Sequence, residues 1–93
     1  MNIEELLNEL GISEKGSYAD DASYVIDIGG SNQYGRINSI LDRSDLLEEI
    51  SSSSFVTTEN ANIDYKYEDQ YILSLIADFD EDEYKLVITG MED

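Results

Sequence analysis

The last third of the chain carries the pattern that most restricts the fold. From Asn62 to Tyr67 the sequence NIDYKY alternates apolar and charged residues, which is the period of a β-strand with one buried face. The segment 70–79, QYILSLIADF, alternates in the same way but also carries isoleucines on its second face, and a third apolar segment occupies 84–90. Acidic turns separate the three segments, so we predict an antiparallel meander. The middle strand is apolar on both faces, which is typical of a central strand that helices cover.

The N-terminal segment 2–10, NIEELLNEL, predicts an amphipathic helix. Its apolar residues recur at the spacing of one helix face, and glutamates occupy the other face. Asn2 is a suitable N-cap, with Glu5 three residues later as in a capping box. Gly11 is a typical residue to end the helix.

The middle of the chain is less regular. Residues 13–22 read as a loop. A hairpin is predicted from a strand at 24–28, a turn at GGSN and a return strand over 33–41, although the apolar residues of that last segment also fit a helix. The segment 44–50, SDLLEEI, predicts a short helix with Ser44 as its N-cap, and the four serines at 51–54 end it.

These segments together predict one α+β domain over residues 1–93, because 93 residues is a typical length for a single domain. We expect an antiparallel sheet with a C-terminal three-stranded meander, packed by short helices, in the order α-β-β-α-β-β-β.

Charge restricts the possible partners of the chain. It has 22 acidic and five basic residues, a formal net charge of −17, whereas solubility of a small domain needs a magnitude of only about 2–8. We expect no direct binding to nucleic acid, because phosphate contacts need Lys and Arg, and none to anionic membranes. A strongly basic protein surface is the favoured partner.

The residues that are missing restrict the chemistry. With no Cys and no His, the chain has no thiolate nucleophile, no histidine-based triad and no zinc site. We therefore expect no enzyme activity and no cofactor. The absence of Cys suits a reducing compartment, and the chain has neither a long apolar run nor the basic start of a signal peptide, so we expect a cytoplasmic protein.

Two motifs resemble ligand loops. GGSNQYG at 29–35 lacks both GxGxxG spacing and the Lys-Ser/Thr ending of a P-loop, so we interpret it as a hairpin turn. DFDEDEYKL at 78–86 begins like a calcium loop, but Glu83 stands where an EF-hand needs Gly and Thr89 where it needs Glu. We therefore predict no specific metal site there and interpret the segment as a charged turn between two strands.

The same acidic turn is the candidate binding site. If the strand continued through it, Asp78, Asp80 and Asp82 would form a row with about 6.6 Å between neighbours. DNA also presents a dense array of negative charges. We expect exposed tyrosines beside acids to face arginines of a partner, with Tyr84 and Tyr18 as the candidates. The predicted partner-binding residues, with carboxylates as phosphate mimics, are Asp78, Asp80, Glu81, Asp82, Glu83, Tyr84, Asp20, Asp21 and Tyr18.

The whole-chain profile resembles the small acidic DNA-mimic anti-CRISPR proteins of phages and mobile elements. The shared features are the short chain, the N-terminal helix MNIEELLNEL, the small α+β body, the absence of Cys and acids grouped around turns such as DFDEDE. The resemblance implies an inhibitor in the cytoplasm of a bacterial host. Its partner would be a CRISPR effector such as Cas9, at the basic site where target DNA or its PAM duplex enters.

Two other classes remain open. An immunity protein that neutralises a bacterial nuclease toxin is also small, acidic and tight-binding. An acidic adaptor for a basic peptide, or a highly soluble structural module, is the third. The identity of the captured partner distinguishes the three.

Overall fold

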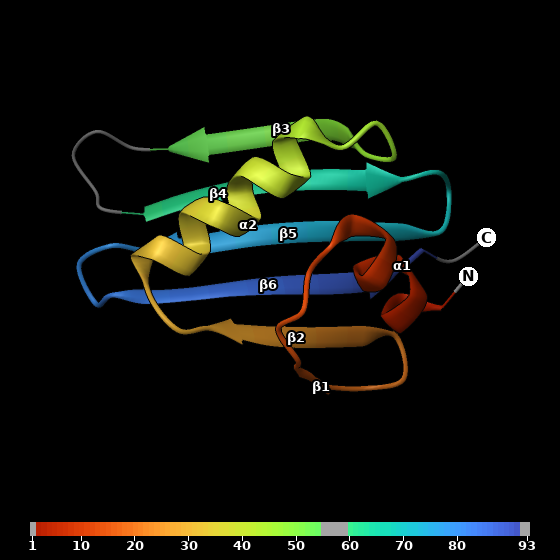
Figure 1. Ribbon diagram of the computed structural model, residues 1–93, viewed down its shortest axis with the longest axis horizontal. Coiled ribbons are helices and arrows are strands. Elements are labelled where there is room, and N and C mark those ends of the chain that lie inside the picture. Colours follow the sequence, from red (N-terminus) through yellow and green to blue (C-terminus); the bar gives the residue numbers. More distant parts are fainter. Residues whose placement is uncertain (1, 55–59, 92–93) are drawn as a thin grey trace.

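The computed structural model describes residues 2–54 and 60–91, which form one sheet with two helices on one of its faces (Figure 1). The elements are α1 (Ile3–Leu10), β1 (Ser17–Tyr18), β2 (Ser23–Ile28), α2 (Ser31–Arg43), β3 (Glu48–Ser54), β4 (Asn60–Tyr67), β5 (Tyr71–Asp78) and β6 (Glu83–Gly90). The strands lie in the order β1-β2-β6-β5-β4-β3, and every neighbouring pair is antiparallel. The predicted α+β class and the C-terminal meander are confirmed, with one strand more than the predicted order contains.

Strand pairing aligns the buried side chains in rows across the sheet. Leu73 of β5 pairs with Ile88 of β6 on one side and with Tyr65 of β4 on the other, and Tyr24 of β2 continues the row beyond Ile88. All four side chains are buried. Because the next row, two residues along each strand, repeats this pattern, one face of the sheet forms the floor of the core.

Helix α1 forms as predicted. It buries Ile3, Leu6, Leu7 and Leu10 against the sheet. The Asn2 side chain accepts a hydrogen bond from the Glu5 N–H at 2.8 Å, which confirms the N-cap. Gly11 ends the helix with φ of 83°, a conformation that glycine adopts without a steric penalty.

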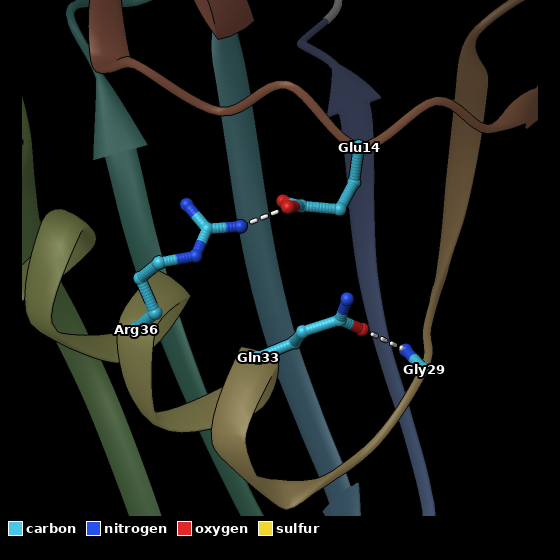
Figure 2. Close-up of polar contacts among 4 residues, drawn as sticks. All are labelled: Glu14, Gly29, Gln33 and Arg36. Carbon is cyan, nitrogen blue, oxygen red and sulfur yellow. Dashed lines mark hydrogen bonds and ion pairs between the residues drawn. The ribbon is translucent and has the colours of Figure 1, made fainter.

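Helix α2 replaces the predicted return strand over 33–41, and GGSN is the start of this helix rather than a hairpin turn. Tyr34, Ile37 and Leu41 lie on one helix face and are buried, because the helical spacing that also fitted this segment brings all three onto the sheet. Gln33 accepts a hydrogen bond from the Gly29 N–H at 2.8 Å (Figure 2), which satisfies a donor just before the helix.

An ion pair ties α2 to the segment that follows α1. The Arg36 guanidinium contacts the Glu14 carboxylate, from opposite sides of the space between that segment and the helix (Figure 2). This contact holds the segment after α1 against the helical layer.

The predicted helix over 44–50 is also wrong. Ser44 is the C-cap of α2, and its hydroxyl accepts a hydrogen bond from the Leu46 N–H at 3.1 Å. The chain then turns and enters β3, where Glu48 pairs with Lys66 and the serines 51–54 continue the pairing with β4. Leu46 and Ile50 fit a helical period, but both are exposed, and pairing with β4 provides the backbone hydrogen bonds of this segment instead.

The predicted loop 13–22 contains β1, a two-residue strand at the edge of the sheet. A second difference concerns the cover of β5. The helices lie on one face only, so Ile72 and Ile76 on its other face are half-buried rather than covered (Figure 1).

Candidate partner-binding site

The acidic turn, defined here as residues 78–83, joins β5 to β6 at one end of the sheet. Asp78 and Glu83 form the last pair of the two strands, and the four residues between them make the turn. The Glu81 N–H donates to Asp78 Oδ1 at 3.2 Å, and Asp82 takes a left-handed backbone conformation with φ of 54°. Asp78 therefore shapes the turn, while the carboxylates of Asp80, Glu81, Asp82 and Glu83 are exposed.

The predicted straight row of Asp78, Asp80 and Asp82 is wrong, because β5 ends at Asp78. Beyond it the chain reverses within four residues. The carboxylates are thus grouped around a tight hairpin instead of lying along an extended strand, which concentrates their field at one end of the molecule.

A cluster of three aromatic rings supports the acidic turn. The centroid of the Tyr34 ring lies 5.1 Å from that of Tyr84 and 5.7 Å from that of Phe79, and the Phe79 and Tyr84 centroids are 5.8 Å apart. These separations and tilted geometries are those of favourable aromatic packing. The cluster connects the turn to α2, because Tyr34 belongs to that helix.

Tyr84 is not the exposed aromatic that the sequence predicted. It pairs with Ile28 and Ala77 on the covered face, and only 5% of its surface is accessible. Burial raises the pKa of its hydroxyl, and so do a hydrogen bond to the Asp82 carboxylate and the charge of that group. Tyr84 therefore anchors the turn to the core from below.

Phe79 is the exposed aromatic at this site, and the sequence interpretation missed it. Alternation along 70–79 placed Phe79 with the buried face of the strand. In the structure the strand stops one residue earlier, and the Phe79 side chain is 45% exposed at the acidic turn. Its position between Asp78 and Asp80 could have predicted this exposure, because a single apolar residue inside a charged turn rarely belongs to the core.

The turn 19–22, which contains Asp20 and Asp21, joins β1 to β2 at the opposite end of the sheet (Figure 1), and Tyr18 of β1 lies beside it through its pairing with Tyr24. The turn 19–22 is closed by a 2.8 Å hydrogen bond from the Ala22 N–H to Asp20 Oδ1, and it contacts the last residue of β6 through the Gly90 N–H. Since β6 spans roughly 23 Å from end to end, the structure does not bring these residues to the acidic turn.

Tyr18 is exposed as predicted, with 54% of its surface accessible. Its ring packs edge-on against Tyr24 at a centroid distance of 4.9 Å. The turn at Glu68 and Asp69 lies at this same end, so the molecule carries carboxylates at both ends of its sheet.

Beside the acidic turn lies a shallow hollow of about 260 Å³. Asp82 and Glu83 line it from the turn, Asp27 and Ile28 from β2, and Tyr84 and Lys85 from β6. Three carboxylates against one base make the hollow negative, which favours a cationic group such as a guanidinium.

Among residues 2–54 and 60–91, no group of three or more acidic side chains is arranged to hold a metal ion. In the same part of the chain, neither helix has the length and apolar character needed to cross a membrane. Comparisons with protein-family models, curated proteins and solved structures found no match.

Proposed function

We propose that this protein is an inhibitor that mimics DNA and occupies the basic nucleic-acid site of a CRISPR effector such as Cas9. The observation that carries the proposal is the acidic turn, where five carboxylates surround an exposed Phe79 on a hairpin anchored by buried aromatic rings. Effectors of this class hold nucleic acid in positively charged channels and read the PAM through arginines.

Both the rigid position of the carboxylates and their charge support competition between the acidic turn and DNA for the basic site. A hairpin fixed to the core presents its carboxylates without the entropy cost of ordering a flexible tail on binding. In the hollow, the carboxylates of Asp82, Glu83 and Asp27 outnumber the single base, Lys85, and they would take an arginine of the partner. Phe79 would contribute a central apolar contact, as aromatic residues do in binding hot spots. The proposal places the inhibitor in the cytoplasm, where the effector acts.

The decisive measurement is competition. The protein is labelled, its complex with a purified Cas9–guide complex is titrated by fluorescence anisotropy, and target duplex carrying a PAM is added. We expect the duplex to displace the inhibitor, and the inhibitor to abolish DNA cleavage. Binding that saturating duplex leaves unchanged would contradict DNA mimicry. Capture of a nuclease toxin instead of an effector would favour an immunity protein.

The site assignment has its own test. The variant D80N/E81Q/D82N/E83Q removes four charges and keeps Asp78, which shapes the turn. The matched control D20N/D21N/E68Q/D69N removes four charges at the opposite end. We expect the first variant to weaken effector binding by at least about 100-fold and the control by less than about tenfold. Equal losses would show that net charge alone drives binding.

Phe79 is tested separately with F79S, which leaves every charge in place. We expect the affinity to fall by about tenfold or more, as for removal of an aromatic hot-spot residue, and the free energy of unfolding to fall by about 1–2 kcal/mol because the ring packs on Tyr34 and Tyr84. An unchanged affinity would exclude Phe79 from the interface.

A further inference from the structure

One face of the sheet has no helical cover in the part of the chain that the structure describes. The open face consists of the residues of β2, β6, β5 and β4 whose side chains point away from α1 and α2. Its centre is apolar and half-buried, formed by Val25, Val87, Ile72 and Ile76. An apolar sheet face that no helix covers is typical of a surface that packs against a further layer.

The open face is electrically unlike the rest of the molecule. Its three central rows across β2, β6, β5 and β4 contain two acids, Asp27 and Asp64, and two bases, Lys85 and Lys66, so their formal charges sum to zero. The whole chain carries −17. A second copy of this chain therefore approaches this face at a lower electrostatic cost than it approaches the acidic ends of the sheet.

The charges on this face are also arranged for pairing with themselves. Asp27 on β2 and Lys66 on β4 stand at diagonally opposite corners of the three rows. A two-fold axis lying between two such faces, along the other diagonal, would set Lys66 of each copy over Asp27 of its partner. Lys66 also contacts Asp69 of its own chain at 3.0 Å. With ordinary strand and residue spacings it would also bring Lys85 to within about 2 Å, measured in the plane, of the position over Asp64. This arrangement crosses the strands at about 90°, one of the usual ways in which sheets pack.

We propose that two copies of this chain associate face to face through the open face. The three rows of the open face measure about 19 Å across its four strands and about 20 Å along them, so two copies crossed at about 90° would bury on the order of 800 Å². This is less than stable specific interfaces bury, so the dimer is a weak and concentration-dependent one. The inference goes beyond the proposed function and shares one residue with it, because Asp27 lies both on this face and in the hollow beside the acidic turn, whereas the carboxylates of residues 80–83 lie at the edge of the face and stay accessible.

Sedimentation equilibrium tests the proposal, with wild-type protein from about 10 µM to about 1 mM in roughly 0.15 M and 0.5 M NaCl. We expect the mean mass to rise with concentration from 10.5 kDa toward twice that value, and further at the higher salt, where repulsion is screened. Wild-type protein that stays monomeric at the highest concentration in both buffers would overturn the proposal.

Substitutions locate the interface. V87K places a charge in the apolar centre, and we expect the dimer dissociation constant to rise at least about tenfold even though the net charge becomes less negative. The control L46K makes the same change at an exposed position outside the open face and should leave dimerisation unchanged or slightly stronger. K66D should weaken the dimer, and D27K/K66D should restore it, because the reciprocal pairs return with opposite sign. A dimer that survives V87K would overturn the proposal and place the contact elsewhere, such as the edge of β3.

Discussion

At the scale of single residues, the hydroxyl of Tyr65 is the polar group most at odds with its surroundings. The side chain is 2% exposed, and among the described residues its hydroxyl has no hydrogen-bond partner. Burial raises the pKa of Tyr65 to about 12, with smaller contributions from the charges of Asp42 and Glu49. An unpaired buried hydroxyl costs about 1–3 kcal/mol, so the phenol ring stabilises the core while its oxygen opposes that gain.

The variant Y65F keeps the ring and removes the oxygen. We expect the free energy of unfolding in urea at neutral pH to stay unchanged or to rise by up to about 1 kcal/mol. In alkali the wild-type protein should lose stability as pH rises from about 10 to about 12, because the unfolded chain releases this proton at the lower pH while the folded protein holds it. Y65F should show a shallower loss. Identical slopes for the two proteins would mean that Tyr65 ionises as easily in the folded state as in the unfolded one.

Sequence alone identified the acidic residues at the candidate site but not the aromatic one. Carboxylates are exposed wherever a turn falls, so DFDEDE predicted a charged hairpin correctly. The roles of Phe79 and Tyr84 depend on the residue at which β5 ends, because a shift of one position exchanges the two faces of a strand. Periodicity does not specify that residue, whereas the pairing of Asp78 with Glu83 does.

At the scale of elements, the close approach of the segment after α1 to β2 depends on a residue without a side chain. A Cβ at Gly16 would lie 2.0 Å from the backbone oxygen of Val25, closer than any real contact. The Gly16 N–H also donates to the Tyr24 hydroxyl at 2.9 Å. This segment, which leads into β1, can therefore lie against β2 only with glycine at this position.

Two glycine substitutions should act in opposite directions. We expect G16A to lower the free energy of unfolding by about 1–3 kcal/mol, because backbone must move to admit the methyl group. Gly35 lies inside α2 with open space around its Cα, so G35A should raise the free energy of unfolding by about 0.5–1 kcal/mol through helix propensity. Urea unfolding of both variants measures the two values. A neutral G16A would show that the segment after α1 moves at little cost.

The elements that the sequence predicted correctly are those with a single compatible pattern. The meander and α1 each show one clear period, and their ends carry recognisable turns or caps. The segments at 33–41 and 44–50 fit more than one structure. Packing in the folded protein decided between them. Helix α2 covers the sheet, and β3 extends the sheet by pairing with β4, a contact that the pattern within 44–50 does not indicate.

At the scale of the whole molecule, charge and shape act together. The molecule measures 37 × 25 × 24 Å, and carboxylates gather at both ends of the sheet. Two of the five bases, Arg36 and Arg43, line a groove between α1 and α2, while Lys66 and Lys85 lie on the open face. Lys66 contacts Asp69 at one end of the sheet and Lys85 lines the hollow at the other, and with five bases against 22 acids both ends keep an excess of negative charge.

This distribution predicts opposite effects of salt on folding and on binding. A compact body with a charge of −17 repels itself more strongly than its expanded unfolded chain does, so screening should raise the urea midpoint of unfolding between about 0.02 M and 0.5 M NaCl. Urea is the suitable denaturant because guanidinium is itself a salt. The variant D80N/E81Q/D82N/E83Q, which lowers the charge from −17 to −13, should be more stable at low salt and less sensitive to added salt.

Partner binding should respond in the reverse sense, because the same screening removes the attraction between the acidic turn and a basic channel. The affinity for the effector should therefore fall over the salt range in which the fold becomes more stable. Anisotropy titrations and urea unfolding in matched buffers test both effects, and a loss of binding at high salt then has a cause other than unfolding. An affinity that stays constant across this range would show that apolar contacts, rather than mimicry of a polyanion, hold the complex together.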